Sequence, residues 1–254
     1  MSKEIELDCP SGLQVKLRGI KGKDLDGLRD KRRVATGEAF SKLLDDCTLQ
    51  VMDHGPYPPA GWSWKQALVG DRVRGLIGLR CATSGQEYMF RTRCADRNCA
   101  GWIDWQLDLL DLPMKRLSPE SRERFLTGNR FETHVGGRRV VFQLTTGESQ
   151  AKAIRMQEQL LATQKRQREM GQQVTDGNAL LGLASRIVEV ESESNVMAFL
   201  GELDLGDVQA LLASMDRADC GVETTLDVVC ERCSEVTTTE LPLDARFFKP
   251  TTTS

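Results

Sequence analysis

The clearest structural signal is a stretch that reads Glu223-Thr224-Thr225-Leu226-Asp227-Val228-Val229-Cys230-Glu231-Arg232-Cys233. A second stretch reads Cys94-Ala95-Asp96-Arg97-Asn98-Cys99, and it follows another predicted strand, over 87–93. In both places a further strand pattern comes after the second cysteine, so each pair is expected to lie in a turn between two strands. Such a turn points two thiolates at one spot, as a tetrahedral metal ion requires.

One structural zinc ion is predicted at four cysteines: Cys94, Cys99, Cys230 and Cys233. Each pair supplies half of a closed site, and Arg97 and Arg232 lie inside the turns, where they offset thiolate charge. Two alternatives stay open. One alternative is a redox-active cysteine pair, but a thioredoxin-like site needs a βαβ context that the pattern lacks. The other alternative is that all four cysteines are free thiols.

The two halves of the chain repeat one pattern of glycines, apolar residues and strand signals. The positions Gly12, Val15, Leu17 and Gly22 lie 125 residues before Gly137, Val140, Phe142 and Gly147. Matching residues from Gly70 to Cys94 lie 136 residues before those from Gly206 to Cys230. This order predicts a diverged tandem duplication and a pseudo-twofold molecule, whereas an ordinary mixed domain with coincidental spacing is the alternative.

The pattern as a whole predicts an α+β fold in two repeat halves. Residues 1–115 form the first half, 116–129 a polar connector and 130–254 the second half. Each half is expected to contain a β-hairpin, helices and a zinc-knuckle strand pair. The second half adds a long, polar, glutamine-rich helix over 148–173, which is expected to project or to lie on the surface.

Local periodicity places the elements within each half. Apolar residues alternate in strands and recur every three or four positions in helices. The resulting prediction is a hairpin over 5–17, a helix around 40–47, a loop over 53–64, a helix over 71–81, strands over 87–93 and around 102–105, a second hairpin over 130–144, a helix over 207–217 and a strand over 223–229.

Composition and charge argue against several classes of protein. With 40% hydrophobic residues in 254, the chain can bury a core, unlike a disordered protein. No apolar run approaches the roughly 20 residues of a membrane helix, and the charged start lacks a signal peptide, so a cytosolic protein with reduced thiols is expected. Residues 189–244 carry 14 acidic residues against two arginines, a net of −12, which leaves +9 elsewhere. Such opposed regions pack on each other, dock subunits or remain two solvated faces.

An enzyme is not expected. The chain has only two histidines, His54 and His134, and neither lies in a metalloprotease pattern or beside a nucleophile. The sequence has no phosphate-binding loop, no dinucleotide fingerprint and no local pair of carboxylates suited to acid–base catalysis. A binding or structural role is the remaining expectation.

The loop over 53–64 is rich in proline and aromatic residues, and it allows two interpretations. Tyr57, Trp62 and Trp64 on a stiff loop would form an anchor for a partner, because large rigid rings dominate binding energy at interfaces. The same rings would otherwise cover the core of the first half, and this second interpretation is slightly favoured. The two interpretations differ in whether the rings are exposed.

Several short motifs resemble those of the baseplate hub assembly or chaperone proteins of contractile-tailed, T-even-type phages. They are Pro10-Ser11-Gly12-Leu13 with Val15, Leu17-Arg18-Gly19 and Gly22, then Cys230 with Cys233, Leu241-Pro242-Leu243, and Phe247-Phe248 with Pro250. Residues 148–195 match no motif of that family, and the four-residue gap between Cys94 and Cys99 is wider than a tight knuckle. The resemblance implies a non-enzymatic role in building the tail baseplate.

The same resemblance implies partners and a location. Hub and wedge proteins and the tail-length-measuring protein would be the partners, in a larger protein assembly. The chain would act in the host cytoplasm during assembly or remain in the tail baseplate of the virion.

A zinc-ribbon module that binds nucleic acid is the main alternative. Such a module needs basic and aromatic residues around its cysteines. The surroundings of Cys230 and Cys233 are acidic instead, since Glu223, Asp227, Glu231 and Glu235 lie nearby in the sequence. The charge pattern therefore argues against nucleic acid as the partner.

Overall fold

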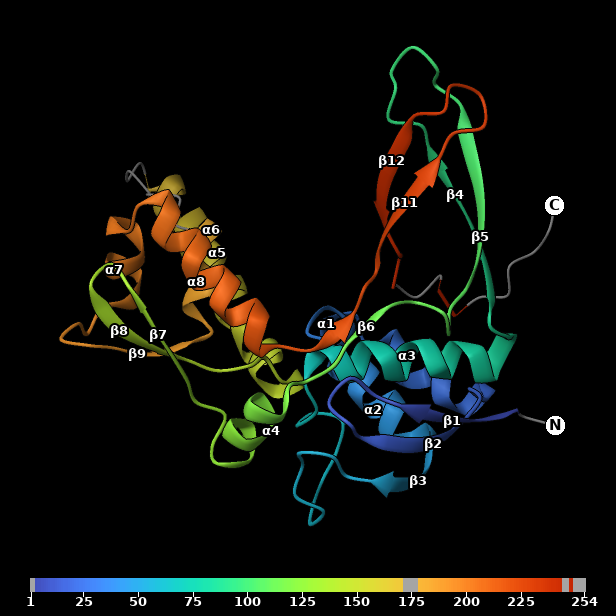
Figure 1. Ribbon diagram of the computed structural model, residues 1–254, viewed down its shortest axis with the longest axis horizontal. Coiled ribbons are helices and arrows are strands. Elements are labelled where there is room, and N and C mark those ends of the chain that lie inside the picture. The colour runs from blue at the N-terminus through green and yellow to red at the C-terminus, as the bar shows by residue number, and fades with distance from the viewer. Residues whose placement is uncertain (1–2, 171–177, 244–246, 249–254) are drawn as a thin grey trace.

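The computed structural model describes residues 3–170, 178–243 and 247–248. Helices and several small antiparallel sheets make up these residues, which confirms the α+β class. Two parts project from a common base, one mainly helical and the other a ribbon arm (Figure 1). Among the described residues, no helix combines the length and the apolar composition needed to span a membrane.

A three-stranded sheet opens the chain. β1 (Glu4–Asp8) and β2 (Gln14–Arg18) form the predicted hairpin, and β3 (Thr48–Asp53) pairs with β2 as a third antiparallel strand. The hairpin turn needs Gly12, whose φ of 92° is strained for any other residue. The segment between β2 and β3 contains η1 (Gly22–Arg29), α1 (Lys31–Ala35) and α2 (Glu38–Cys47).

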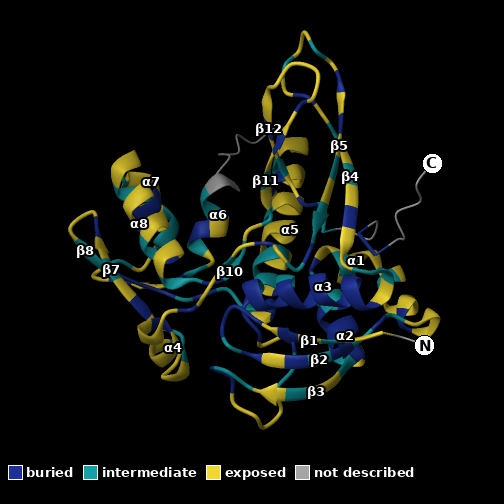
Figure 2. Ribbon diagram, turned by 45° about the vertical axis from the view of Figure 1, so that its right-hand side comes forward, coloured by how far each residue is buried: buried dark blue, intermediate teal, exposed yellow. Residues whose placement is uncertain are grey.

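The central helix, α3 (Val69–Ser84), includes the predicted span 71–81 and packs on β1 and β2. Most of its residues are buried, so the helix forms the middle of the base (Figure 2). Glycines let neighbours approach its backbone. A Cβ on Gly70 would lie 2.3 Å from the Cys220 carbonyl oxygen, and one on Gly78 would lie 2.0 Å from a Leu7 methyl.

The second half forms another three-stranded sheet, with helices beside it. Its strands are β7 (Phe131–Val135), β8 (Arg138–Phe142) and β9 (Ile187–Val190). Its helices are α5 (Gly147–Glu169), α6 (Asn178–Ala184), α7 (Val196–Glu202) and α8 (Leu205–Ala218). α8 packs on β7, as α3 packs on β1. The predicted long helix is α5, whose residues are mostly exposed, and predicted positions 171–173 lie outside the described residues.

The two sheets agree in topology and share one of their register shifts, while a further shift between Gln14 and Val15 occurs only in the first. The strand orders are β1-β2-β3 and β7-β8-β9, and in both sheets helices precede the third strand. The register between β2 and β3 shifts between Lys16 and Leu17, and that between β8 and β9 shifts between Val141 and Phe142. These two positions are 125 residues apart, the same offset that relates the two hairpins in the sequence.

The arm consists of two antiparallel ribbons from distant parts of the chain. β4 (Glu87–Arg93) pairs with β5 (Trp102–Asp108), and β11 (Thr225–Val229) pairs with β12 (Val236–Glu240). The ribbons lie side by side, with β5 in contact with β11 (Figure 1). A small apolar cluster, separate from the main core, fills the space between them.

The two predicted halves also meet away from the arm. β6 (Met114–Lys115) pairs with β10 (Gly221–Val222) just beside α3. The polar connector contains a helix, α4 (Pro119–Leu126), whose first turn is capped by the Ser118 side chain. Proline at the first helical position fits this start, because its missing N–H would have no partner there. The connector is therefore partly helical.

Candidate metal centre

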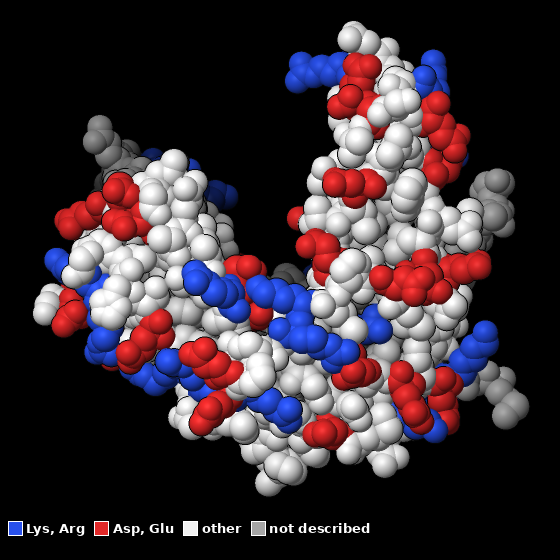
Figure 3. All heavy atoms as spheres, in the orientation of Figure 1, with Lys and Arg blue, Asp and Glu red and all other residues white. Residues whose placement is uncertain are grey.

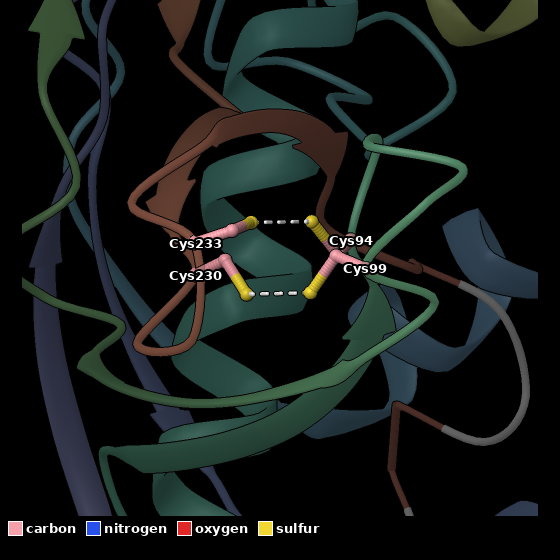
Figure 4. A group of neighbouring side chains, drawn as sticks. All are labelled: Cys94, Cys99, Cys230 and Cys233. Carbon is pink, nitrogen blue, oxygen red and sulfur yellow. Dashed lines mark hydrogen bonds between the residues drawn. The ribbon is translucent and has the colours of Figure 1, made fainter.

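Four cysteines converge at the end of the arm, two from each ribbon (Figure 4). The Sγ atoms of Cys94 and Cys233 lie 3.5 Å apart, and those of Cys99 and Cys230 lie 3.8 Å apart. All four Sγ atoms lie within 4.8 Å of one another. Residues 94 and 99 are thus brought to residues 230 and 233 by the fold, as the spacing of the two pairs predicts.

These separations suit a tetrahedral ion. Four sulfurs at ~2.3 Å from a zinc ion are roughly 3.8 Å apart, from the geometry of a tetrahedron. A disulfide would instead place two sulfurs about 2.05 Å apart. The four-cysteine cluster therefore has the spacing of a closed structural metal site, and zinc is the ion that such donor sets most often hold.

Backbone turns hold the thiols in position. The knuckle after β11 is closed by two hydrogen bonds, from Cys230 N to Glu235 O at 2.9 Å and from Ser234 N to Cys230 O at 2.8 Å. Ser234 adopts a φ of 60°, in the left-handed region that lets the chain return along β12. In the other turn, Cys94 N donates to Gly101 O at 3.0 Å.

The backbone also favours a thiolate. The N–H groups of Arg232 and Cys233 donate to the Cys230 sulfur and lower the pKa of that thiol to about 7. A metal site needs deprotonated thiols, and these donors favour the thiolate at Cys230 alone. Burial raises the pKa of Cys94, and burial together with hydrogen bonds from the neighbouring thiols raises the pKa of Cys233 to about 12. A Cβ on Gly101 would lie 3.2 Å from the Cys99 sulfur, so the small residue leaves room beside the cluster.

The arm has little else to stabilise it. The small cluster between the ribbons contains only Ile103 and Val228 besides Cys94 and Cys230, with Phe90 and Trp105 partly buried against them. A two-stranded ribbon alone is marginally stable in water. A metal bound by all four thiols would therefore provide much of the free energy that keeps the two ribbons together.

The remaining four cysteines lie away from the cluster. Cys9, Cys47, Cys81 and Cys220 are buried. Burial raises the pKa of Cys47 and that of Cys81 to about 11, so both are neutral thiols at neutral pH. They behave as small apolar residues of the core.

Two of the three rings of the loop over 53–64 lie in the core, whereas residues 58–61 between them are exposed. Tyr57 is 3% exposed and Trp64 0% exposed, while Trp62 is half-buried against both rings. The Tyr57 hydroxyl donates to the Asp71 carboxylate at 2.5 Å, and Trp64 Nε1 donates to Thr48 Oγ1 at 2.9 Å. The burial of Tyr57 and Trp64 corrects the interpretation that these two rings anchor a partner. Their polar atoms already have hydrogen-bond partners and their rings fill the core, so no ring face is left for a partner to contact.

A different tryptophan is exposed. Trp102 on β5 is 54% exposed and faces Arg93 across the ribbon. The Arg93 guanidinium lies 4.7 Å from the centre of the Trp102 ring, and that of Arg91 lies 6.0 Å from it. This group was not predicted from the sequence, since a tryptophan in a strand can face either side. Only the register of β4 against β5, which pairs Trp102 with Arg93, shows that the ring and the guanidinium share one face of the ribbon.

Comparison with known proteins adds no relative. No family model, no curated protein and no solved structure matches the chain.

We expect one tightly bound zinc ion per chain in protein purified without added metal. The reason is the closed set of four thiols at tetrahedral spacing. Elemental analysis by mass spectrometry, with thiol titration before and after a strong chelator, measures both the metal and the thiols it protects. A zinc content near zero, with the four arm thiols freely titratable, would remove the metal from the site.

Proposed function

We propose that the chain is a non-enzymatic structural or assembly protein that acts by binding other proteins, with a structural zinc site at the end of its arm. The observation that carries the proposal is the arm itself, where two ribbons more than 100 residues apart in sequence meet at four cysteines. A site closed by four protein ligands has no open position for a substrate. Its role is then to hold a binding surface in shape.

We further propose that the chain arose by tandem duplication. Support comes from the equal strand orders, from the register shifts at Lys16–Leu17 and Val141–Phe142, and from glycines at positive φ in both hairpin turns, Gly12 and Gly137. The helices α3 and α8 begin 136 residues apart, at Val69 and Leu205, and β4 and β11 end at the same offset. The zinc site would then join two related ribbons, one from each half.

The setting we propose is the baseplate of a contractile phage tail. The support is the resemblance of the short motifs at the start and end of the chain to hub assembly proteins. The partners would be hub and wedge proteins and the tail-length-measuring protein. The chain would act in the host cytoplasm during assembly or remain in the virion baseplate. The test is to look for the chain in purified tails and assembly intermediates, where we expect it beside the hub and wedge proteins.

The partner surface we propose is the face of the arm around Trp102. Tryptophan and arginine are the residues most enriched among those that dominate interface energies, and here Arg91 and Arg93 flank the ring. Arg91 also pairs with Asp104 at 2.6 Å, which fixes the guanidinium beside the ring. A rigid, amphipathic surface of this kind loses little conformational entropy on binding.

Trp102→Ala is therefore expected to weaken binding to co-expressed hub or wedge protein about 30-fold or more. That factor corresponds to the ~2 kcal/mol typical of a dominant interface residue. Affinity measured by biolayer interferometry, with zinc content checked, gives the result. Val236→Ala serves as the matched control, since Val236 is 52% exposed on the other ribbon. Unchanged affinity in a folded, zinc-loaded Trp102→Ala protein would exclude this face as the contact.

Nucleic acid remains the second candidate, and the same residues favour it. An exposed tryptophan beside arginines can stack on a base. Acidic side chains also lie on the arm, however, and Figure 3 shows them beside the basic ones near its tip. A DNA and RNA binding assay at several salt concentrations separates the candidates, because binding through phosphates falls steeply as salt rises. Tight, salt-dependent binding that Trp102→Ala abolishes would favour nucleic acid over protein.

A further inference from the structure

A pocket of about 230 Å³ lies between α1, α2, α3 and α5, and none of the four cysteines of the cluster lines it. Its walls are apolar side chains apart from three positions: Arg72, Gln150 and Gly37. The apolar walls include Phe40, Val73, Leu76, Ile154 and Leu243. One charged group therefore faces a pocket that is otherwise suited to a hydrocarbon.

Arg72 is buried without a counter-charge. The residue is only 5% exposed. Its guanidinium donates hydrogen bonds to two neutral acceptors, Gln150 Oε1 at 2.6 Å and Gly37 O at 2.8 Å. Its Nε has no hydrogen-bond partner, and no carboxylate of the described residues forms an ion pair with it. Burial lowers the pKa of this guanidinium, which shows the cost of the isolated charge.

The neighbouring backbone adds positive potential. Gly37 is the N-cap of α2, and Gly147 is the first residue of α5, so two helix N-termini lie beside Arg72. A Cβ on Gly147 would lie 2.8 Å from Arg72 Nε, which places the guanidinium directly against the start of α5. Helix N-termini carry partial positive charge, so they disfavour a cation there and favour an anion.

The nearest acidic residue along α2 is already paired. Glu38 contacts Arg155 at 2.5 Å and accepts a hydrogen bond from Thr36 at 3.1 Å, and these partners lower its pKa. The two hydrogen bonds of Arg72 go to Gln150 and Gly37 and not to Glu38. A buried arginine needs a hydrogen-bonded anion to offset its desolvation, and this chain supplies none at that position among the described residues.

We propose that the pocket beside Arg72 binds a small carboxylate attached to an aliphatic body. The carboxylate would accept hydrogen bonds from Arg72, and the aliphatic part would lie against Phe40, Leu76 and Ile154. A single carboxylate on a hydrocarbon fits a pocket with one cation and apolar walls. A peptide would bring backbone donors and acceptors that such walls leave unpaired. The site is independent of the arm and of the proposed partner surface.

The test is a titration with hexanoate, monitored by nuclear magnetic resonance of the α2 and α5 amides, with hexan-1-ol as the uncharged control. We expect saturable binding of hexanoate, at least about tenfold tighter than hexan-1-ol, because charge-assisted hydrogen bonds distinguish the two. Equal affinity for the two compounds, or no saturation by hexanoate, would overturn the proposal.

Two variants identify the site. Arg72→Met keeps an unbranched apolar stem and removes the charged guanidinium, so hexanoate should lose its advantage over hexan-1-ol. Ile154→Trp fills the pocket from α5 and keeps Arg72, so both compounds should stop binding there. If Arg72→Met does not fold, Ile154→Trp alone decides. Either of two results would place the ligand elsewhere and reject the pocket: an advantage of hexanoate over hexan-1-ol that survives in folded Arg72→Met, or hexanoate binding that survives in folded Ile154→Trp.

Discussion

Replacing Cys230 by serine is expected to release the metal and unfold the whole arm, both ribbons together, while the base of the protein stays folded. Cys230 contributes one of four ligands, and its sulfur lies 3.8 Å from that of Cys99 on the other ribbon. Loss of one thiolate opens a closed site, and structural zinc supplies apparent binding free energies of ~10–16 kcal/mol in small domains. The arm has few buried side chains of its own to replace that contribution.

Hydrogen exchange measured by mass spectrometry distinguishes the arm from the base. Amide protection over 87–108 and over 225–240 should fall by about 100-fold or more, since local opening then needs little free energy. Protection in α3 should change little, because its buried residues belong to the main core and not to the arm cluster. Arg232→Ala is the matched control, since it alters the same knuckle and leaves all four thiols in place.

The contrary outcome is well defined. If Cys230→Ser exposes only 225–240 while 87–108 keep their protection, the two ribbons do not share a metal. The four thiols would then be two independent pairs that happen to lie within 4.8 Å. Equal exchange across α3 and the arm would instead mean that the base and the arm unfold as one unit.

The cysteine site could be predicted from sequence because its signal is local. Each pair lies in a short turn between strands whose alternation is clear, and the structure gives β4 the predicted span, Glu87–Arg93. The third strands of the two sheets, β3 and β9, were not predicted. Both have an irregular burial pattern and a register shift against their neighbour, so the period of two is lost. Only pairing with β2 and β8 defines them as strands.

Residues whose roles depend on tertiary placement could not be predicted. Trp102 and Trp105 lie three positions apart on β5 and therefore face opposite sides, but the sequence does not say which side is covered by β11. Arg72 follows Asp71 in an unremarkable helical stretch, and its isolation arises from α2 and α5 closing around it. The aromatic loop was ambiguous for the same reason, because exposure is decided by what packs on it.

Trp64→Ala is expected to destabilise the protein by about 3–5 kcal/mol, the usual cost of removing a large buried ring. Trp64 is 0% exposed and packs against α3, where a Cβ on Gly75 would lie 2.8 Å from its ring. Its indole N–H also donates to Thr48 on β3, so the ring ties the loop to both the sheet and the central helix. An alanine would leave a cavity that the close-packed surroundings fill only in part, and it would remove the donor to Thr48 Oγ1, whose own hydrogen bond to Leu44 O would remain.

Thermal melting by circular dichroism gives the measurement, with a fall in Tm of roughly 6–20 °C expected for a chain of this size. Trp102→Ala is the matched control, because the same substitution at a 54% exposed ring should change stability by about 0.5–1 kcal/mol at most. The opposite interpretation, in which the loop over 53–64 anchors a partner, makes a different prediction for Trp64→Ala. A Trp64→Ala protein that melts like the wild type and loses partner binding would return the anchor to the loop. A large fall in Tm, with the Trp102 variant stable and defective in binding, assigns Trp64 to the core and Trp102 to the interface.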